Sequence, residues 1–467
     1  MLAADHRRFV WATLLVRGAA AAYASVFIAL NYLIIRVEIY PLLIYTLPCL
    51  LGSAMLLWAL LPVRERVIER CPLNSPSLDL ALRDICAKAG VPVAKRVEIL
   101  FAVNAAAYTL KQESRVAIGF PLLATLSRCQ VDAVVAHEIA HHLYGDTGSG
   151  RISRRLDQLL ERMVRLMSRR APALILLPFR PVFLSLLRYV RETHRECEFH
   201  ADEFAARTIG LAPYLDVLNG FSRIDALWEF FLDHWVLLVR AARVAIDLTS
   251  MYEAFLATGI AERIRVSPSS GFSGAYDTHP SVRERVERLR QADPSASCNE
   301  KVDAGVGDVK HEILNPDVLS AEFYHQVLNL HATSFDRFAA GYPKIAEALM
   351  ARFGPALAPF AWSDLDDLPR VFSQYSFASY QATGIDNYEF EKYVFVFLVS
   401  YLIFTRSGQP LCVSEYCVPN LTIDGAKADL WSIVSSQFGE RDSRLAEVLI
   451  AVGIDSGEKL IDEKCEG

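Results

Sequence analysis

A histidine, a glutamate and a second histidine in this 467-residue chain have the spacing of a metal-dependent hydrolase. His137, Glu138 and His141 lie in the order H-E-x-x-H within Val131 to Asp146, where the apolar residues predict a buried helix. Because residues four apart share one helical face, both imidazoles can bind a single Zn²⁺, with Glu138 beside a water on that ion. This is hydrolytic geometry, and it requires a third ligand.

The third ligand is expected on a second helix, within Arg191 to Arg207. Catalytic zinc commonly takes two histidines and one glutamate, so Glu198 can complete the set, with one Zn²⁺ per chain. Asp202 lies one turn further along. It can accept a hydrogen bond from the far ring nitrogen of a ligating histidine and fix its tautomer.

These blocks resemble the M48 family of integral-membrane zinc metallopeptidases. The resemblance rests on AHEIAHHLYGD, on R-x-x-E-F-x-A-D from Arg195 to Asp202, and on His279-Pro280 with Arg285 six residues after the histidine. The last block is similar to the H-P-x-x-x-x-R segment of the family. The resemblance implies that His279 hydrogen-bonds the oxyanion and that Arg285 orients the groups around the ligands.

Upstream of the metal helix, the sequence predicts a helix at Leu78 to Gly90 and strands at Val97 to Val103 and Arg115 to Phe120. Asn104 and Ala105, before the second strand, are similar to the edge strand over the active site in that family. An extended substrate could add to such an edge through main-chain hydrogen bonds. Which of the two strands is the edge stays open, and an ordinary strand at the margin of a small sheet is the alternative.

The predicted fold is mainly α, in the α+β class: a gluzincin-type zinc metalloprotease domain with a small β-sheet. This domain is expected to span residues 71–295, between an N-terminal transmembrane hairpin in residues 1–70 and a helical region of unknown role in residues 296–467. Within it, residues 151–190 predict a membrane-associated insertion. Residues 171–187 are too few to cross a bilayer twice, so a re-entrant or interfacial hairpin is expected there, with a buried helical hairpin as the alternative.

Two uncharged apolar runs near the N-terminus, Gly18 to Ile35 and Ile39 to Val63, are each long enough to cross a bilayer. A hydrophobic content of 52% agrees with membrane segments. Arginines precede the first run and follow the second, so the positive-inside rule places the catalytic domain on the cytoplasmic side of the cell (inner) membrane. A cleaved signal peptide is the alternative, disfavoured because a second apolar run follows at once.

The net charge of -6 and the absence of a basic tail give no reason to expect a nucleic-acid partner. Nine cysteines without C-x-x-C spacing argue against a disulfide framework. Further along, Ala226 to Leu256 predicts one long amphipathic helix in which His234 is a core residue rather than a ligand. Tyr393 to Thr405 is too short for a confident membrane span and predicts a buried helix.

Together these features predict an integral, multi-pass zinc endopeptidase of the HtpX-like branch, with polypeptide substrates and the lipid bilayer as partners. Membrane protein quality control is its candidate role. A CAAX-prenyl-type protease is one alternative, disfavoured because chains of that branch carry many more spans. A catalytically silent zinc-bound membrane scaffold is another, disfavoured because a scaffold would have no need of Glu138 as a base.

Overall fold

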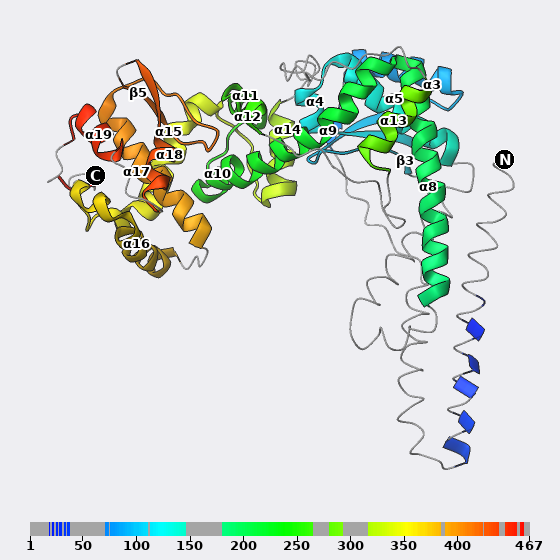
Figure 1. The fold of residues 1–467 in the computed structure, drawn as a ribbon, viewed down its shortest axis with the longest axis horizontal. Helices are drawn as coiled ribbons and strands as arrows, with labels where there is room; N and C mark the ends of the chain where they lie inside the picture. The colour runs from blue at the N-terminus through cyan, green and yellow to red at the C-terminus, as the bar shows by residue number, and fades with distance from the viewer. Residues whose placement is uncertain are drawn as a thin grey trace. The chain divides into compact units, whose positions relative to one another are not determined.

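The computed structural model describes residues 71–145, 180–264, 280–292 and 316–461, apart from residues 74, 111–112, 384–387, 424, 439–443 and 455–457 (Figure 1). It also describes scattered helical positions between residues 18 and 37. The predicted transmembrane hairpin therefore lies almost entirely outside the described residues, as do residues 146–179 and His279. In the described part of the chain, no helix combines the length and apolar character needed to cross a membrane.

The chain divides into two compact units. The first consists of Met1–Phe221 and Ser267–Glu312, and the second of Ser222–Val266 and Ile313–Gly467. The segment Ser222–Val266, which lies within the domain predicted for residues 71–295, groups with the C-terminal region in this division. Aromatic contacts explain this grouping, since the ring of Trp235 lies 4.8 Å from that of Phe338.

The first unit contains a four-stranded sheet in the order β1-β2-β4-β3. Strands β2 and β4 are parallel, and the two outer pairs are antiparallel. The predicted strands are confirmed as β2 and β4, but neither lies at an edge. The edge next to β4 is β3, whose first residue is Ala105, so the edge strand lies where the resemblance of Asn104-Ala105 placed it. The pattern of apolar residues did not predict β3, because AAAYTL has weak alternation of apolar and polar residues. The strands are β1 (Cys71–Leu73), β2 (Arg96–Leu100), β3 (Ala105–Leu110) and β4 (Glu113–Gly119).

Two helices pack beside this sheet. Helix α3 (Pro76–Ala89) begins where Ser75 caps the Leu78 N–H and ends at Gly90, whose φ of 68° suits glycine. Helix α5 (Arg128–Gly145) contacts α3, β3 and β4, and a short helix α4 (Phe120–Thr125) leads into it. The helix predicted around the H-E-x-x-H motif is therefore confirmed and is longer than expected at its N-terminal end.

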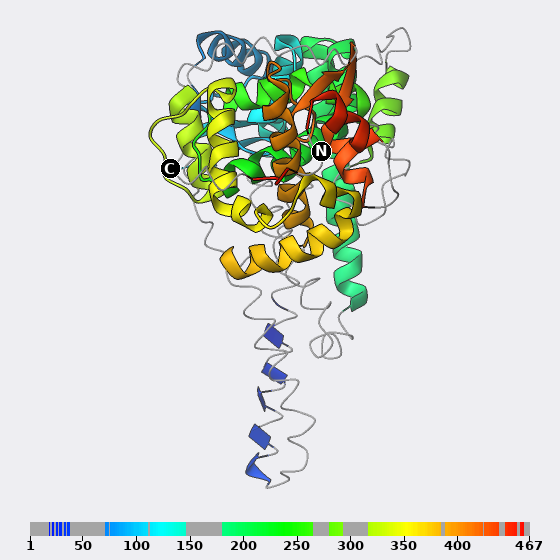
Figure 2. The same cartoon turned by 90° about the vertical axis from the view of Figure 1, so that its left-hand side faces the viewer.

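Helix α8 (Arg180–Ile209) is a single 30-residue helix whose N-terminal half extends away from the sheet (Figures 1 and 2). Residues 171–179 of the predicted re-entrant or interfacial hairpin lie outside the described residues, and from Arg180 the chain is continuous helix up to Glu198 and beyond. Pro181 does not interrupt it, since a proline in the first turn costs no backbone hydrogen bond. The C-terminal half of α8 packs against α5 and α13 (Val282–Ala292).

In the second unit, the long helix predicted for Ala226 to Leu256 is wrong. Helix α9 (Leu211–Phe231) continues through a π-helical turn, η3 (Leu232–Val236), into α10 (Leu237–Ala242). The helix then ends at Arg243, which has a φ of 56°, and α11 (Leu248–Ala257) starts anew with Asp247 as its cap. A left-handed arginine leaves no signal in the sequence pattern.

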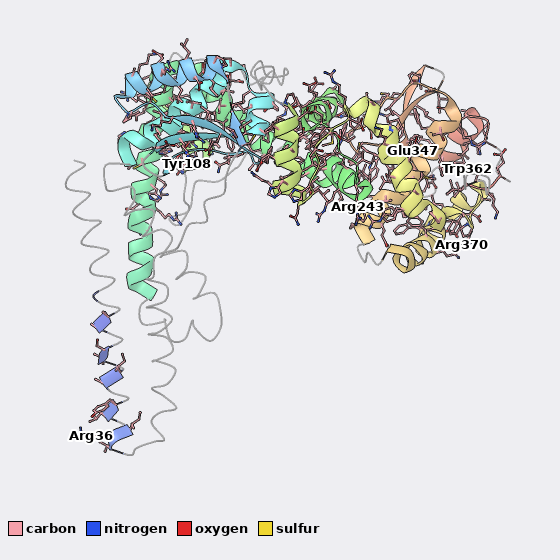
Figure 3. The ribbon with its side chains drawn as sticks, turned by 180° about the vertical axis from the view of Figure 1, so that it is seen from behind. Arg36, Tyr108, Arg243, Glu347, Trp362 and Arg370 are labelled. Carbon is pink, nitrogen blue, oxygen red and sulfur yellow. The ribbon has the colours of Figure 1, made fainter. Side chains whose placement is uncertain are left out.

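The core of the second unit surrounds α17 (Tyr388–Ser407), in which residues 394–399 are fully buried. The prediction of a buried helix at Tyr393 to Thr405 is therefore confirmed. Trp362 is buried in the same unit, whereas Arg370 forms an exposed ion pair with Asp364 (Figure 3). The remaining elements named in this unit are α14 (Pro316–Phe323), α15 (Phe338–Phe353), α16 (Leu368–Thr383), β5 (Asn420–Ile423), β6 (Ala426–Asp429), α18 (Leu430–Ser436) and α19 (Arg444–Ala451).

Candidate metal centre

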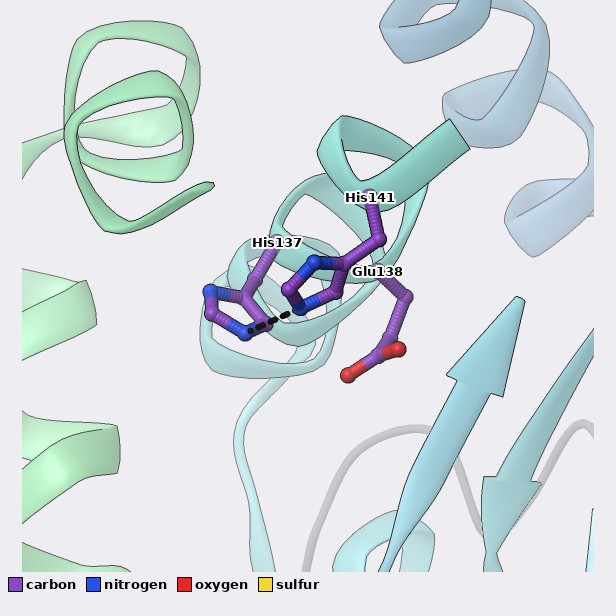
Figure 4. Close-up of side chains that lie close together, drawn as sticks. All are labelled: His137, Glu138 and His141. Atoms are coloured by element: carbon purple, nitrogen blue, oxygen red, sulfur yellow. Dashed lines mark hydrogen bonds between the residues drawn. The ribbon is translucent and has the colours of Figure 1, made fainter. Parts of the chain in front are cut away.

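Helix α5 places the residues of the H-E-x-x-H motif at one point (Figure 4). Ala136, Ile139 and Ala140 are fully buried and hold the helix in place. The imidazoles of His137 and His141 lie edge to face, with their Nε2 atoms 3.1 Å apart. Both rings therefore present the same nitrogen to one position.

Glu198 reaches this position from α8. Its Oε2 atom lies 3.5 Å from Nε2 of His137, and its Oε1 atom lies 3.6 Å from Nε2 of His141. Zinc held tetrahedrally by bonds of about 2.0–2.1 Å places neighbouring ligand atoms roughly 3.3 Å apart. The separations of 3.1, 3.5 and 3.6 Å fit such an ion, and the three predicted ligands come together.

The carboxylates around the two histidines favour a positive charge at this position. Burial alone would lower the pKa of His137, but its hydrogen bonds to Asp202 and Glu198 outweigh that effect and raise the pKa to about 9. Burial and the neighbouring charge of His137 lower the pKa of His141 to about 4. The carboxylates therefore favour one positive charge between the rings, and a metal ion can take the place of a proton there.

Glu138 stands beside the ligands on the side of α5 that faces the strands (Figure 4). Burial raises the pKa of its carboxyl group to about 7, although the charge of His137 opposes the shift. The carboxylate accepts a hydrogen bond from the backbone N–H of Ala107 in β3. A carboxyl group with a pKa near neutral suits proton transfer in both directions.

Behind His137, Asp202 and Arg285 form a buried ion pair. Asp202 lies 3.1 Å from Nδ1 of His137, and Arg285 binds both of its oxygens, with Nε–Oδ2 at 2.8 Å and Nη2–Oδ1 at 2.5 Å. Burial would raise the pKa of Asp202, but the hydrogen bonds from Arg285 lower it, so the carboxylate stays charged. Asp202 is thus placed to hold the His137 ring, and Arg285 to hold Asp202.

The comparisons with known proteins agree with this geometry. Residues 72–293 match the sequence profile of peptidase family M48. They form a domain of that family. A protease HtpX homologue from Chlorobium phaeobacteroides (strain BS1) is 27% identical over 271 residues, which are 53% of this chain and 78% of the relative. Membership of this family implies a protease, and the matched range includes both metal-ligand helices and α13.

The predicted substrate residues of the M48 domain lie at the start of the edge strand. The side-chain Oδ1 of Asn104 accepts a hydrogen bond from the backbone N–H of Ala105, the first residue of β3. Its carbonyl oxygen accepts from the N–H of Gly119 at 2.8 Å. A Cβ atom on Gly119 would come within 2.0 Å of the Ala102 carbonyl oxygen, so only glycine fits beneath this loop.

Tyr214 is the residue of the M48 site that the sequence analysis missed. It lies one turn into α9 and is buried, with its hydroxyl 2.8 Å from Nδ1 of His137. Gly210, with a φ of 127°, turns the chain between α8 and α9, and the first turn of α9 then brings Tyr214 to His137 and Asp202. The sequence signal that could have pointed to Tyr214 is a tyrosine four residues after a helix-ending glycine, which is weak.

Proposed function

We propose that this protease is a zinc-dependent endopeptidase that hydrolyses peptide bonds in polypeptide segments. The observation that carries the proposal is the convergence of His137, His141 and Glu198, whose facing atoms lie 3.1–3.6 Å apart. Zn²⁺ bound by these residues would polarise the scissile carbonyl and make an attacking water more acidic.

The protein's own groups supply the remaining steps. Glu138 accepts a proton from the water that attacks the carbonyl carbon and passes it to the amide nitrogen as the C–N bond breaks. The main chain of β3 holds an extended substrate by strand addition, and the hydrogen bond from Ala107 to Glu138 links that strand to the base. His279 is proposed, by the M48 resemblance alone, to donate a hydrogen bond to the oxyanion.

We further propose an HtpX-like role at a membrane, with the catalytic domain on the cytoplasmic side and membrane proteins as substrates for quality control. The name of the relative, protease HtpX homologue, supports the protease branch. The two apolar runs within residues 18–63 support attachment to the bilayer.

The test compares wild type with Glu138→Gln, both purified in detergent. Because the amide cannot accept the proton, casein cleavage is expected to fall by at least about 100-fold. Zinc content, measured by atomic emission, is expected to stay at one ion per chain, since Glu138 is not among the three ligands. A matched control is Glu113→Gln, which changes a partly exposed carboxylate on β4 that pairs with Lys95 and is expected to retain full activity.

Other outcomes would contradict the proposal in recognisable ways. Zinc retained with no cleavage by the wild type would indicate a scaffold. Cleavage of a farnesylated peptide but not of casein would indicate a CAAX-type protease. Cleavage retained by Glu138→Gln would remove Glu138 from its proposed role.

A further inference from the structure

We infer that the Tyr214 hydroxyl is a positioning group, which decides that His137 carries its proton on Nδ1 and so presents Nε2 to the metal. The inference rests on the proposed zinc site. It concerns a residue that touches neither the metal nor the substrate and acts through the His137 ring.

The hydroxyl of Tyr214 lies among three polar partners. Its oxygen is 2.6 Å from Oδ1 of Asp202, 2.8 Å from Nδ1 of His137 and 2.9 Å from Nη2 of Arg285. The side chain is only 2% exposed. A hydroxyl can donate one hydrogen bond and accept two, so these three contacts use its full capacity.

The direction of each hydrogen bond follows from the chemistry of the partners. Arg285 can only donate, so the hydroxyl accepts from it. Asp202, held charged by Arg285, can only accept, so the hydroxyl gives its single proton to the carboxylate. The remaining lone pair of the hydroxyl faces His137, and Nδ1 must therefore be the donor.

This assignment determines the metal-binding atom. With the proton held on Nδ1, the free electron pair of a neutral His137 is on Nε2, the atom that faces His141 and Glu198. Asp202 alone makes a longer contact with Nδ1, at 3.1 Å, and its Oδ1 is shared with Arg285 and Tyr214. The hydroxyl is thus the nearer acceptor for the Nδ1 proton.

Packing alone does not explain a hydroxyl at this position. The Tyr214 and His137 rings stack with centroids 5.9 Å apart and planes 24° apart, a contact that phenylalanine would make equally well. What phenylalanine lacks is the link between Asp202, Arg285 and the imidazole. Tyr214→Phe therefore separates the positioning role from the packing role.

The experiment measures zinc affinity by competition with a chromophoric chelator for wild type and Tyr214→Phe. The dissociation constant for zinc is expected to rise about tenfold, as is typical when a partner behind a ligating histidine is removed. The visible spectrum of the Co²⁺-substituted protein is expected to change, because the His137 ring is less firmly oriented. In casein assays of the zinc-loaded protein, kcat should fall while KM stays unchanged.

Tyr342→Phe is the matched control, since it removes another buried tyrosine hydroxyl, one that donates to the Cys417 carbonyl oxygen in the second unit. It is expected to leave zinc affinity and the Co²⁺ spectrum unchanged. A Tyr214→Phe protein that matches wild type within twofold in zinc affinity, with the same Co²⁺ spectrum, overturns the inference.

A double-mutant cycle with Asp202→Asn is a second test of the inference, because it measures whether Tyr214 and Asp202 act together. Both residues act on the same imidazole, so the double variant is expected to lose less zinc affinity than the product of the two single losses. Strictly multiplicative losses would mean independent roles and would contradict the inference. Because zinc affinity is read without substrate, a wild type that binds zinc but cleaves nothing would refute the proposed protease function and not this inference.

Discussion

In the first unit, buried charged groups lie together around one position. In the second unit, by contrast, three buried tyrosine hydroxyls each make hydrogen bonds to different main-chain groups elsewhere in the unit. Glu198 and Asp202 are 6% and 1% exposed, yet they lie together with His137 and Arg285 around one position. Removing these charged side chains from water costs free energy, so such a cluster is expected where the protein binds a charged group.

The tyrosines of the second unit show the contrasting use of buried polar groups. Tyr342 donates to the carbonyl oxygen of Cys417, and Tyr393 donates to that of Tyr416. The hydroxyl of Tyr324 accepts from the N–H of Ile246. Each of these bonds ties a loop or strand end to a helix, which stabilises the fold without gathering charge.

One histidine from each unit shows the same contrast, since the pKa values of His137 and His234 are shifted in opposite directions. The pKa of His137 is raised because carboxylates favour its charged form, whereas burial among aromatic rings lowers the pKa of His234. His234 bonds the Phe230 carbonyl oxygen through Nδ1 and stacks on the Phe230 ring. His234 is only partly buried, so it lies at the margin of the core, and its environment would disfavour a metal ion.

The strongest test of this comparison removes one arginine from each unit. Arg285→Met leaves buried Asp202 without its main partner and is expected to cost about 3–5 kcal/mol. Arg370→Met breaks an exposed pair with Asp364 and is expected to cost less than about 1 kcal/mol. Hydrogen exchange of peptides from α5 and α8, and from α16, measures each loss in its own unit. Equal losses of stability in the two variants would mean that the buried Arg285–Asp202 pair contributes no more than the exposed Arg370–Asp364 pair.

The elements of the metal centre could be predicted because their residues are close in sequence. The H-E-x-x-H spacing places His137 and His141 on one helical face, and Glu198 and Asp202 are spaced one turn apart on another helix. That α5 and α8 pack together was expected only because the three ligands must meet. Local periodicity therefore predicted which helix faces carry the ligands, and the need for three ligands on one metal ion predicted that these faces lie together.

Other features depend on contacts between distant segments and could not be predicted locally. Tyr214 reaches His137 across 77 residues, through a turn at Gly210 that the apolar pattern does not reveal. Strand β3 is stabilised by pairing with β4 rather than by its own alternation. The assignment of Ser222–Val266 to the second unit depends on aromatic contacts such as that between Trp228 and Phe323, more than 90 residues apart in sequence.

A smaller effect is expected from adding one methyl group to a tightly packed glycine in each unit. In Gly119→Ala the new Cβ would meet the backbone oxygen of Ala102, so the loop before β3 must move. In Gly341→Ala it would meet Cδ1 of Ile246, the end of a flexible side chain. We expect a cost of about 2 kcal/mol for Gly119→Ala and less for Gly341→Ala.

The functional consequence separates these two variants more sharply than stability does. Since the Asn104 carbonyl bonds the Gly119 N–H, movement of this loop displaces the start of β3 and should raise KM for casein in Gly119→Ala. Gly341→Ala should leave KM unchanged. An unchanged KM in Gly119→Ala, with a normal zinc content, would count against β3 as the substrate-binding strand.

A further test uses pH alone, with no substitution, and concerns the proton that zinc displaces. The pKa of His137 is raised from 6.5 to about 9, so below pH 9 the zinc-free protein holds a proton that must leave before Nε2 can bind zinc. Between pH 7 and 9, zinc affinity should therefore rise about tenfold per pH unit, or about 1.4 kcal/mol, and then level off. Calorimetry in buffers of different ionisation enthalpy should show about one proton released per zinc.

In the zinc-free protein, His137 and His234 should change the stability of the fold with pH in opposite directions. The His137 proton stabilises the zinc-free fold fully below pH 6.5, and this contribution is lost as the pH rises through about 9. His234, whose pKa is lowered, contributes the opposite slope, with stability lost as the pH falls below 6.5. His234→Gln should therefore leave the proton release on zinc binding unchanged. A reduced release in that variant would show that the two units are not independent in this respect.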